Sequence, residues 1–137
     1  MQYRKFIRVA FFNFIIPVLY DDNYIALKSP LFKEPPETNY VNASRIMFPG
    51  LAQTFIACQA PLSRSFAHFW QMVIEEKVEV IVMVTQLVEG KKVKANQYWP
   101  DKEGTTINLK GNAKVELMDT SFQGDYHVRW KNRNNTN

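Results

Sequence analysis

Three side chains in this sequence have the types and the order that phosphoryl transfer through a cysteine would need. Cys58 is the only cysteine of the chain, and Arg64 and Asp101 follow it. A thiolate can attack phosphorus, an arginine can hold phosphoryl oxygens, and a carboxylic acid can protonate the leaving oxygen. The first hypothesis is therefore a phosphate-ester hydrolase that uses these three residues.

The loop that follows Cys58 argues against this hypothesis. Residues 59–63 contain no glycine, so the positive φ angles that turn successive N–H groups toward an anion would be costly there, and Pro61 has no N–H. The preceding residue is Ala57, which cannot help to ionise a thiol, and burial at a strand end would raise the thiol pKa. We therefore interpret Cys58 as a small apolar residue inside a strand. Arg64 and Asp101 then match the residues that catalysis would need only in their order along the chain.

Composition indicates a folded domain with a large core. The chain has 137 residues, of which 46% are hydrophobic and 14% aromatic, far above a disordered segment. A lone cysteine excludes an internal disulfide and fits a reducing compartment, so we expect a cytoplasmic protein. His68 and His127 have no Cys or His at metal-ligand spacing, so we expect no metal and no cofactor.

The net charge of +4 comes from three short basic clusters, which are Arg4, Lys5 and Arg8, then Lys91, Lys92 and Lys94, then Arg129, Lys131 and Arg133. We interpret them as solvated surface, because no basic stripe alternates with aromatic residues on one periodic face. Nucleic-acid binding is therefore not expected.

The first twenty residues resemble a signal peptide or membrane anchor, because the basic cluster precedes an apolar run at residues 9–20. That run is too short to span a bilayer as a helix, and no small-residue cleavage site follows it. A buried strand explains the same residues, so we do not expect membrane association.

Periodicity predicts an α/β fold with a mixed sheet, one main helix and an antiparallel meander. Residues 27–38, with three prolines, predict an exposed connection. The predicted elements are strands at 40–41 and 54–58 around a turn at 47–52, a helix at 63–77 capped by Ser63 or Ser65, and a strand at 78–85 covered on both faces in the middle of the sheet. Strand, helix and strand would form a βαβ unit. Short β-type runs at 96–99, 105–109, 113–118 and 126–130 then predict the meander.

Five motifs in the middle of the chain resemble classical protein tyrosine phosphatase domains, in the family's order. They are Asn-Tyr-Val-Asn-Ala-Ser at 39–44 ("DYINAS"), residues 54–62 ("YIATQGPL"), 69–73 ("FWxMVW"), 81–85 ("IVMLT") and 94–100 ("KCxxYWP"). Weaker similarity extends to residues 13–27 and 126–129. We accordingly divide one partial domain into a divergent segment at 1–23, a matched region at 24–131 and a polar tail at 132–137.

The resemblance implies structural roles for the residues of the first hypothesis. In its register Cys58 stands where the family usually has Thr, and Trp99-Pro100-Asp101 belongs to the "YWP" strand rather than to the acid loop. The family's acid loop and its His-Cys signature, with the phosphate-binding arginine, would come after residue 137. We therefore expect the chain to lack the C-terminal catalytic half of the fold and to be inactive alone.

Two further residues match positions that border the family's active site. Glu89 and Lys94 correspond to the loop whose Glu pairs with the signature Arg and whose Lys lies beside the acid loop; here we expect a solvated hairpin tip. The family's substrate loop would fall at residues 9–12, where none of its Lys, Asn, Arg and Tyr is present. Only Phe12 could still stack on a phenyl ring.

Three hypotheses for function remain open. The resemblance implies a tyrosine phosphatase, whose partners are phosphotyrosine proteins. A non-catalytic pseudophosphatase module could instead bind another phosphatase domain or protein through exposed strands. The third is a fragment with no function of its own, for which an uncovered sheet edge would give poor solubility.

Overall fold

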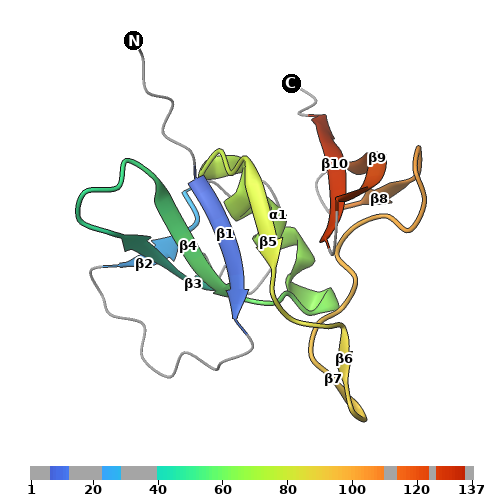
Figure 1. Cartoon of the computed structure of the whole chain (residues 1–137), viewed down its shortest axis with the longest axis horizontal. Coiled ribbons are helices and arrows are strands. Elements are labelled where there is room, and N and C mark those ends of the chain that lie inside the picture. The colour runs from blue at the N-terminus through green and yellow to red at the C-terminus, as the bar shows by residue number, and fades with distance from the viewer. Residues whose placement is uncertain (1–6, 13–22, 29–39, 110–113, 124–125, 135–137) are drawn as a thin grey trace. The chain divides into compact units, whose positions relative to one another are not determined.

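A computed structural model describes residues 7–12, 23–28, 40–109, 114–123 and 126–134 (Figure 1). The chain forms two compact units, Met1–Asn96 and Gln97–Asn137.

The first unit is built on a mixed five-stranded sheet. Its strands are β1 (Ile7–Phe12), β2 (Tyr24–Ala26), β3 (Tyr40–Met47), β4 (Thr54–Gln59) and β5 (Val80–Met83), in the order β2-β3-β4-β1-β5. β1 is parallel to both β4 and β5, whereas β3 is antiparallel to β2 and β4. The mixed sheet of the sequence analysis is thus confirmed, and β4, the helix and β5 form the expected βαβ unit around β1.

Helix α1 (Phe66–Glu75), preceded by the 3-10 turn η1 (Ser63–Ser65), covers one face of this sheet (Figure 1). Its apolar side chains Phe69, Trp70, Met72 and Val73 are buried. The predicted cap is wrong in its chemistry. Ser65 is the N-cap residue, but its hydroxyl makes no capping bond to the helix and instead contacts the backbone of Leu62.

The end of α1 is set by backbone hydrogen bonds. Lys77 has a φ of 51°, its N–H donates to the carbonyl of Ile74, and the N–H of Val78 donates to that of Val73. This pair of bonds is a Schellman motif with Lys77 in the position that glycine usually takes. Val73 and Val78 are both buried, which supplies the hydrophobic contact of the motif.

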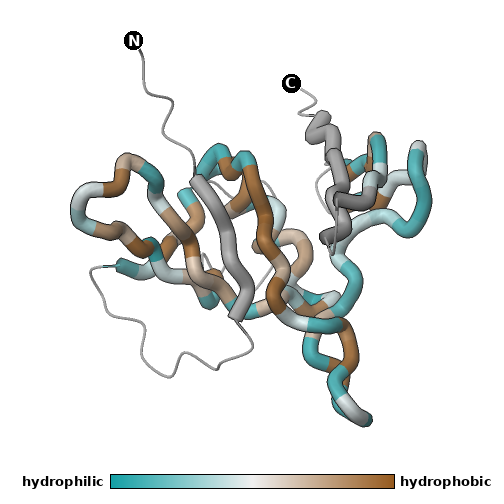
Figure 2. The backbone as a smooth tube through the Cα atoms, in the orientation of Figure 1, coloured by the Kyte–Doolittle hydropathy of each residue, from teal (hydrophilic) through white to brown (hydrophobic). Residues whose placement is uncertain are grey.

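The prediction that the strand at 78–85 is covered on both faces is wrong. β5 is four residues long and stands at the end of the strand order, with β1 as its neighbour in the described part of the chain. Val80 and Val82 are each 42% exposed, whereas Ile81 and Met83 point to the more buried face. Figure 2 shows this apolar strand at the border of the sheet.

A small hairpin follows, made of β6 (Val88–Glu89) and β7 (Lys92–Val93). Its two-residue turn begins at Gly90, whose φ of +61° fits the first position of a type II′ turn. The expected hairpin at this place is therefore present. The predicted β-type run at 96–99 is wrong, because no strand forms there.

The second unit is the predicted meander. β8 (Thr106–Asn108), β9 (Lys114–Gln123) and β10 (Tyr126–Asn134) form an antiparallel sheet in the order β10-β9-β8. Val115 and Leu117 on β9 are buried. β10 extends into the polar tail as far as Asn134, with a bulge between Trp130 and Lys131.

Candidate functional site

Cys58 lies inside the sheet of the first unit. It is the fifth residue of β4, and its neighbours in register are Phe11 on β1 and Ala43 on β3. The side chain is 1% exposed, and burial raises the pKa of the thiol above its ordinary value of 9.0. The sulfur is therefore protonated near neutral pH, and no solvent-borne ester reaches it. The interpretation of Cys58 as a structural residue agrees with this placement.

The loop between β4 and α1 does not form an anion cradle. The N–H of Leu62 donates to Ser65 Oγ at 3.0 Å, and the N–H of Ser63 donates to Asn96 Oδ1 at 3.1 Å. Among the described residues Lys77 is the only non-glycine with a positive φ, so no left-handed residue turns successive N–H groups of this loop toward one point. The amides of Leu62 and Ser63 are thus already used within the protein.

Asn96 is a residue that sequence reasoning missed. Its side chain accepts the Ser63 N–H, and its own N–H donates to the carbonyl of Pro61 at 3.3 Å. Two bonds thereby tie the end of the first unit to the start of the helix. The two segments are 33 residues apart, and no local pattern marks the pairing.

Arg64 and Asp101 are both exposed. Arg64 belongs to η1, two residues before α1 begins. Asp101 belongs to the second unit, where Gln97 Nε2 donates to the carbonyl of Trp99 at 3.2 Å and approaches Asp101 Oδ1 at 3.5 Å. Within the first unit, Arg64 is thus exposed whereas Cys58 is buried in the sheet.

Glu89 and Lys94, the residues that border the site in the family, lie together on the β6–β7 hairpin. Lys94 Nζ is 3.7 Å from Glu89 Oε2, and both side chains are partly exposed. Such a pair is worth less than about 1 kcal/mol. Phe12 is the last residue of β1, opposite Gln59, and its side chain lies outside the described part of the structure.

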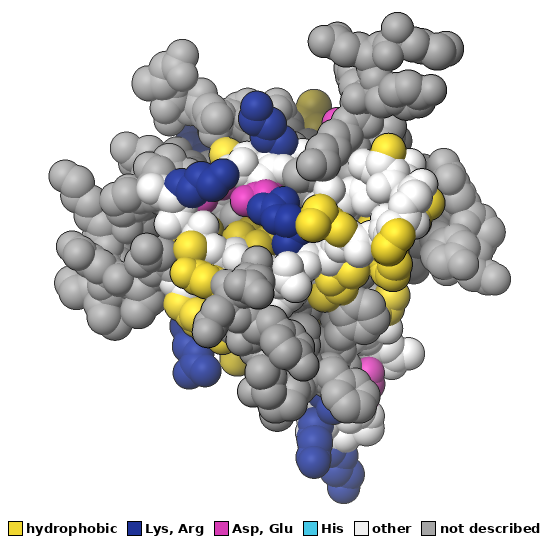
Figure 3. All heavy atoms as spheres, turned by 90° about the vertical axis from the view of Figure 1, so that its left-hand side faces the viewer, with side chains coloured by type: hydrophobic (Ala, Val, Ile, Leu, Met, Phe, Trp, Pro, Cys, Tyr) yellow, Lys and Arg dark blue, Asp and Glu magenta, His cyan; other side chains and the backbone are white. Residues whose placement is uncertain are grey.

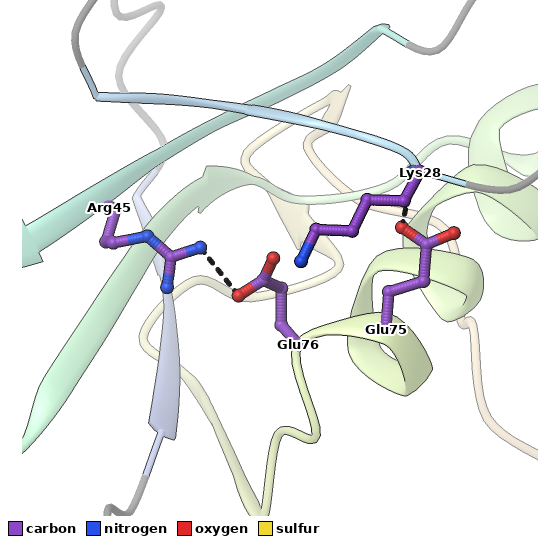
Figure 4. Close-up of polar contacts among 4 residues, drawn as sticks. All are labelled: Lys28, Arg45, Glu75 and Glu76. Carbon is purple, nitrogen blue, oxygen red and sulfur yellow. Dashed lines mark hydrogen bonds and ion pairs between the residues drawn. The ribbon is translucent and has the colours of Figure 1, made fainter.

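A partly buried ion pair is the second feature that sequence reasoning missed. Arg45 Nη2 on β3 lies 2.6 Å from Glu76 Oε2, and the Glu76 side chain is 7% exposed. Beside it, the backbone N–H of Lys28 donates to Glu75 Oε2 at 2.7 Å (Figure 4). The adjacent carboxylates thus bind β3 and the segment just after β2 to the C-terminal end of α1, which is a structural role.

In the described residues, no group of three or more His, Cys, Asp or Glu side chains is placed to hold a metal ion. No helix in the same part of the chain has the length and apolar character to cross a bilayer.

Comparison with known proteins gives a consistent result. The sequence model of the protein-tyrosine phosphatase family matches residues 15–137. The mouse (Mus musculus) tyrosine-protein phosphatase non-receptor type 13 is 45% identical over 84 residues, which are 60% of this chain and 3% of that protein. The mouse receptor-type tyrosine-protein phosphatase alpha is 40% identical over 94 residues, 69% of this chain and 11% of that protein.

A third relative extends the match along the chain. The human (Homo sapiens) receptor-type tyrosine-protein phosphatase F is 35% identical over 112 residues, which cover 82% of this chain and 6% of that protein. The chain therefore spans a small part of the length of each relative. The mixed sheet, the single main helix and the meander agree with part of a phosphatase fold, and the chain belongs to the protein-tyrosine phosphatase family.

Proposed function

We propose that this chain forms the non-catalytic scaffold of a tyrosine phosphatase domain, and that hydrolysis does not occur at Cys58. The family activity is the removal of phosphate from phosphotyrosine in proteins. The observation that carries the proposal is the position of Cys58, 1% exposed in a strand with neighbours on both sides. A nucleophilic thiol needs exposure and a lowered pKa, and this thiol has neither.

Hydrolysis of an aryl phosphate by the purified chain tests this proposal. We expect no turnover above the uncatalysed background, while an intact tyrosine phosphatase domain in the same buffer is active and is inhibited by vanadate. Turnover that vanadate inhibits and that disappears in both Cys58→Ser and Cys58→Ala would show that the proposal is wrong. Far-UV circular dichroism of both variants must show a retained fold, so that loss of activity is not loss of structure.

A specific observation favours a second candidate, a pseudophosphatase module that binds another phosphatase domain. β5 is an end strand whose Val80 and Val82 are 42% exposed, and an exposed end strand can accept a strand of another protein. Pull-down of an intact phosphatase domain by this chain, lost in Val82→Lys but not in Val93→Lys on the separate β7 strand, would support it. Equal binding by both variants would contradict pairing at β5.

The proposed location is the cytoplasm. The single thiol and the lack of any possible internal disulfide fit a reducing compartment. Fractionation of cells that express a tagged chain tests this. Recovery in the secreted fraction would contradict it.

A further inference from the structure

One inner strand of the five-stranded sheet comes from outside the part of the chain that matches the family. Strand β1 lies between β4 and β5 and runs parallel to both (Figure 1). The family's sequence model matches residues 15–137, so β4 and β5 fall within the match and β1 does not. Two strands of the matched part thus stand one strand apart, and a segment from outside that part bridges them.

The space that β1 fills is here called the β4–β5 slot. Residues 8–11 of β1 stand in register with residues 55–58 of β4 on one side and residues 80–83 of β5 on the other. Adjacent strands lie about 4.8 Å apart, so β4 and β5 are roughly 10 Å apart and cannot pair with each other in this arrangement. An empty slot would leave backbone N–H and C=O groups of both walls without partners.

Contacts with the helix hold both walls of the slot without any help from β1. On the β5 side, the buried Val78 lies two residues before the strand, and its N–H donates to the carbonyl of Val73 at 3.0 Å. On the β4 side, β4 pairs with β3, and Arg45 Nη2 of β3 lies 2.6 Å from Glu76 Oε2 at the end of α1. Figure 3, which views the side on which β2 and β3 lie in Figure 1, shows Lys and Arg side chains around a small acidic patch, in keeping with this pairing of charges.

The sequence of β1 suits an enclosed position. Residues 9–12 are Val-Ala-Phe-Phe, a run without charge, and such runs are typical of strands in the interior of an α/β sheet. Residues 7–12 contain no proline, so every residue can donate its N–H to a neighbouring strand. The segment can therefore satisfy the backbone groups of both walls.

We propose that β4 and β5 form a binding slot for one extended apolar segment, and that residues 7–12 occupy it as an exchangeable strand. Strand addition depends on main-chain hydrogen bonds and on alternate side chains, not on how the strand is connected. The same segment supplied by a second molecule would therefore fit the slot in the same parallel register. The slot is distinct from the outer edge of β5, because both of its walls contribute hydrogen bonds.

Amide hydrogen exchange of the whole chain carrying Ala10→Pro tests the proposal. Ala10 stands in register with Ala57 and Val82, and proline removes its N–H and does not fit the interior of a sheet. We expect amides of β4 and β5 to exchange more than about tenfold faster than in the unaltered chain. A capped peptide of residues 7–12 with two added lysines should restore their protection. Thr106→Pro on β8, in the second unit, is the control and should leave exchange at β4 and β5 unchanged.

Cys58, the only cysteine of the chain, can report the register of the added peptide. Phe11 stands in register with Cys58, and Cα atoms of such neighbours lie about 5 Å apart, within the span of a disulfide. Under oxidation with diamide, the peptide carrying Phe11→Cys should crosslink to the Ala10→Pro chain. The peptide carrying Ala10→Cys is one position out of register and should not.

Three results would overturn the proposal. They are unchanged exchange at β4 and β5 in Ala10→Pro, no recovery of protection with the peptide, and equal crosslinking by the two cysteine peptides. If the proline variant does not fold, the same two peptides are offered to the unaltered chain. Release of β1 should then allow the Phe11→Cys peptide to crosslink in preference to the other, and equal or absent crosslinking there would show that the strand is not exchangeable.

Discussion

Replacing Cys58 by serine should destabilise the fold more than replacing it by alanine. The side chain is 1% exposed, so Cys58→Ala leaves a small cavity that costs about 1 kcal/mol. Cys58→Ser also buries a hydroxyl, which adds about 1 to 2 kcal/mol unless it finds a partner. Urea unfolding followed by tryptophan fluorescence at pH 7 measures both differences. A serine variant as stable as the unaltered chain would refute the apolar environment assigned to this position.

The pH dependence of the same comparison tests the protonation state of the thiol. Burial raises the pKa of Cys58 above 9.0, so above that pH the unfolded chain releases a proton that the folded chain keeps. Stability that is fully present below pH 9 is therefore lost as pH rises, by about 1.4 kcal/mol at pH 10. The stability advantage of the unaltered chain over Cys58→Ala should thus vanish or reverse between pH 7 and pH 10. An advantage that grows with pH would indicate a stabilised thiolate and would refute the reasoning.

Further predictions concern the backbone, the ion pair and the hairpin. Lys77→Gly should stabilise the first unit by about 1 kcal/mol in urea unfolding, because glycine adopts a φ of 51° without strain, and an unchanged midpoint would contradict this. Gly50→Ala should cost about 1 kcal/mol in the same assay, because alanine is strained at the φ of +81° that Gly50 adopts, although an added Cβ would meet nothing within 4 Å. Glu76→Gln should destabilise the first unit by about 2 kcal/mol, because it leaves the partly exposed Arg45 without its ion-pair partner. Adding Arg45→Met to this variant should recover part of that loss, and equal costs for the single and double variants would argue against coupling. Trypsin should cut after the exposed Lys91 before it cuts after Arg45 within β3, as mass spectrometry of timed digests would show, and the reverse order would contradict the hairpin.

Local sequence patterns predicted the central elements well. The spacing of Phe69, Trp70 and Val73 marks one face of a helix, and all three are buried in α1. Strand propensity predicted β4 and β5, and the order of strand, helix and strand predicted the βαβ unit. Glycines and short β-type runs located the meander. These features depend on neighbours in sequence, so a sequence pattern records them.

Other features depend on neighbours in space, and the sequence pattern did not record them. The run of Val and Ile at β5 predicts a strand, but its strand propensity does not say whether a second layer covers Val80 and Val82. Tyr98 and Trp99 are strand-forming types, yet no strand forms at 96–99, where Asn96 instead bonds to Ser63 and Pro61. The pair of Arg45 and Glu76 joins residues 31 apart, which no periodicity reveals.

The argument from sequence against the candidate triad is a local one. A phosphate cradle needs several backbone N–H groups that converge on one point, and the glycine-free residues 59–63 cannot supply them cheaply. The structure adds a second reason, since the N–H groups of Leu62 and Ser63 already bond to Ser65 and Asn96. Introducing glycine at position 61 would therefore remove only one obstacle.

The remaining obstacle is the position of the sulfur. Cys58 precedes the end of β4 by one residue, and strands lie on both sides of it in register, so a freed loop would still begin beyond the thiol. Ionisation would leave an uncompensated charge in the sheet, which is why burial raises the thiol pKa rather than lowers it. A catalytic centre in this family fold must therefore place its nucleophile at a loop whose amides are unoccupied. In this chain two amides of the segment from β4 to α1, those of Leu62 and Ser63, instead bond to the side chains of Ser65 and Asn96.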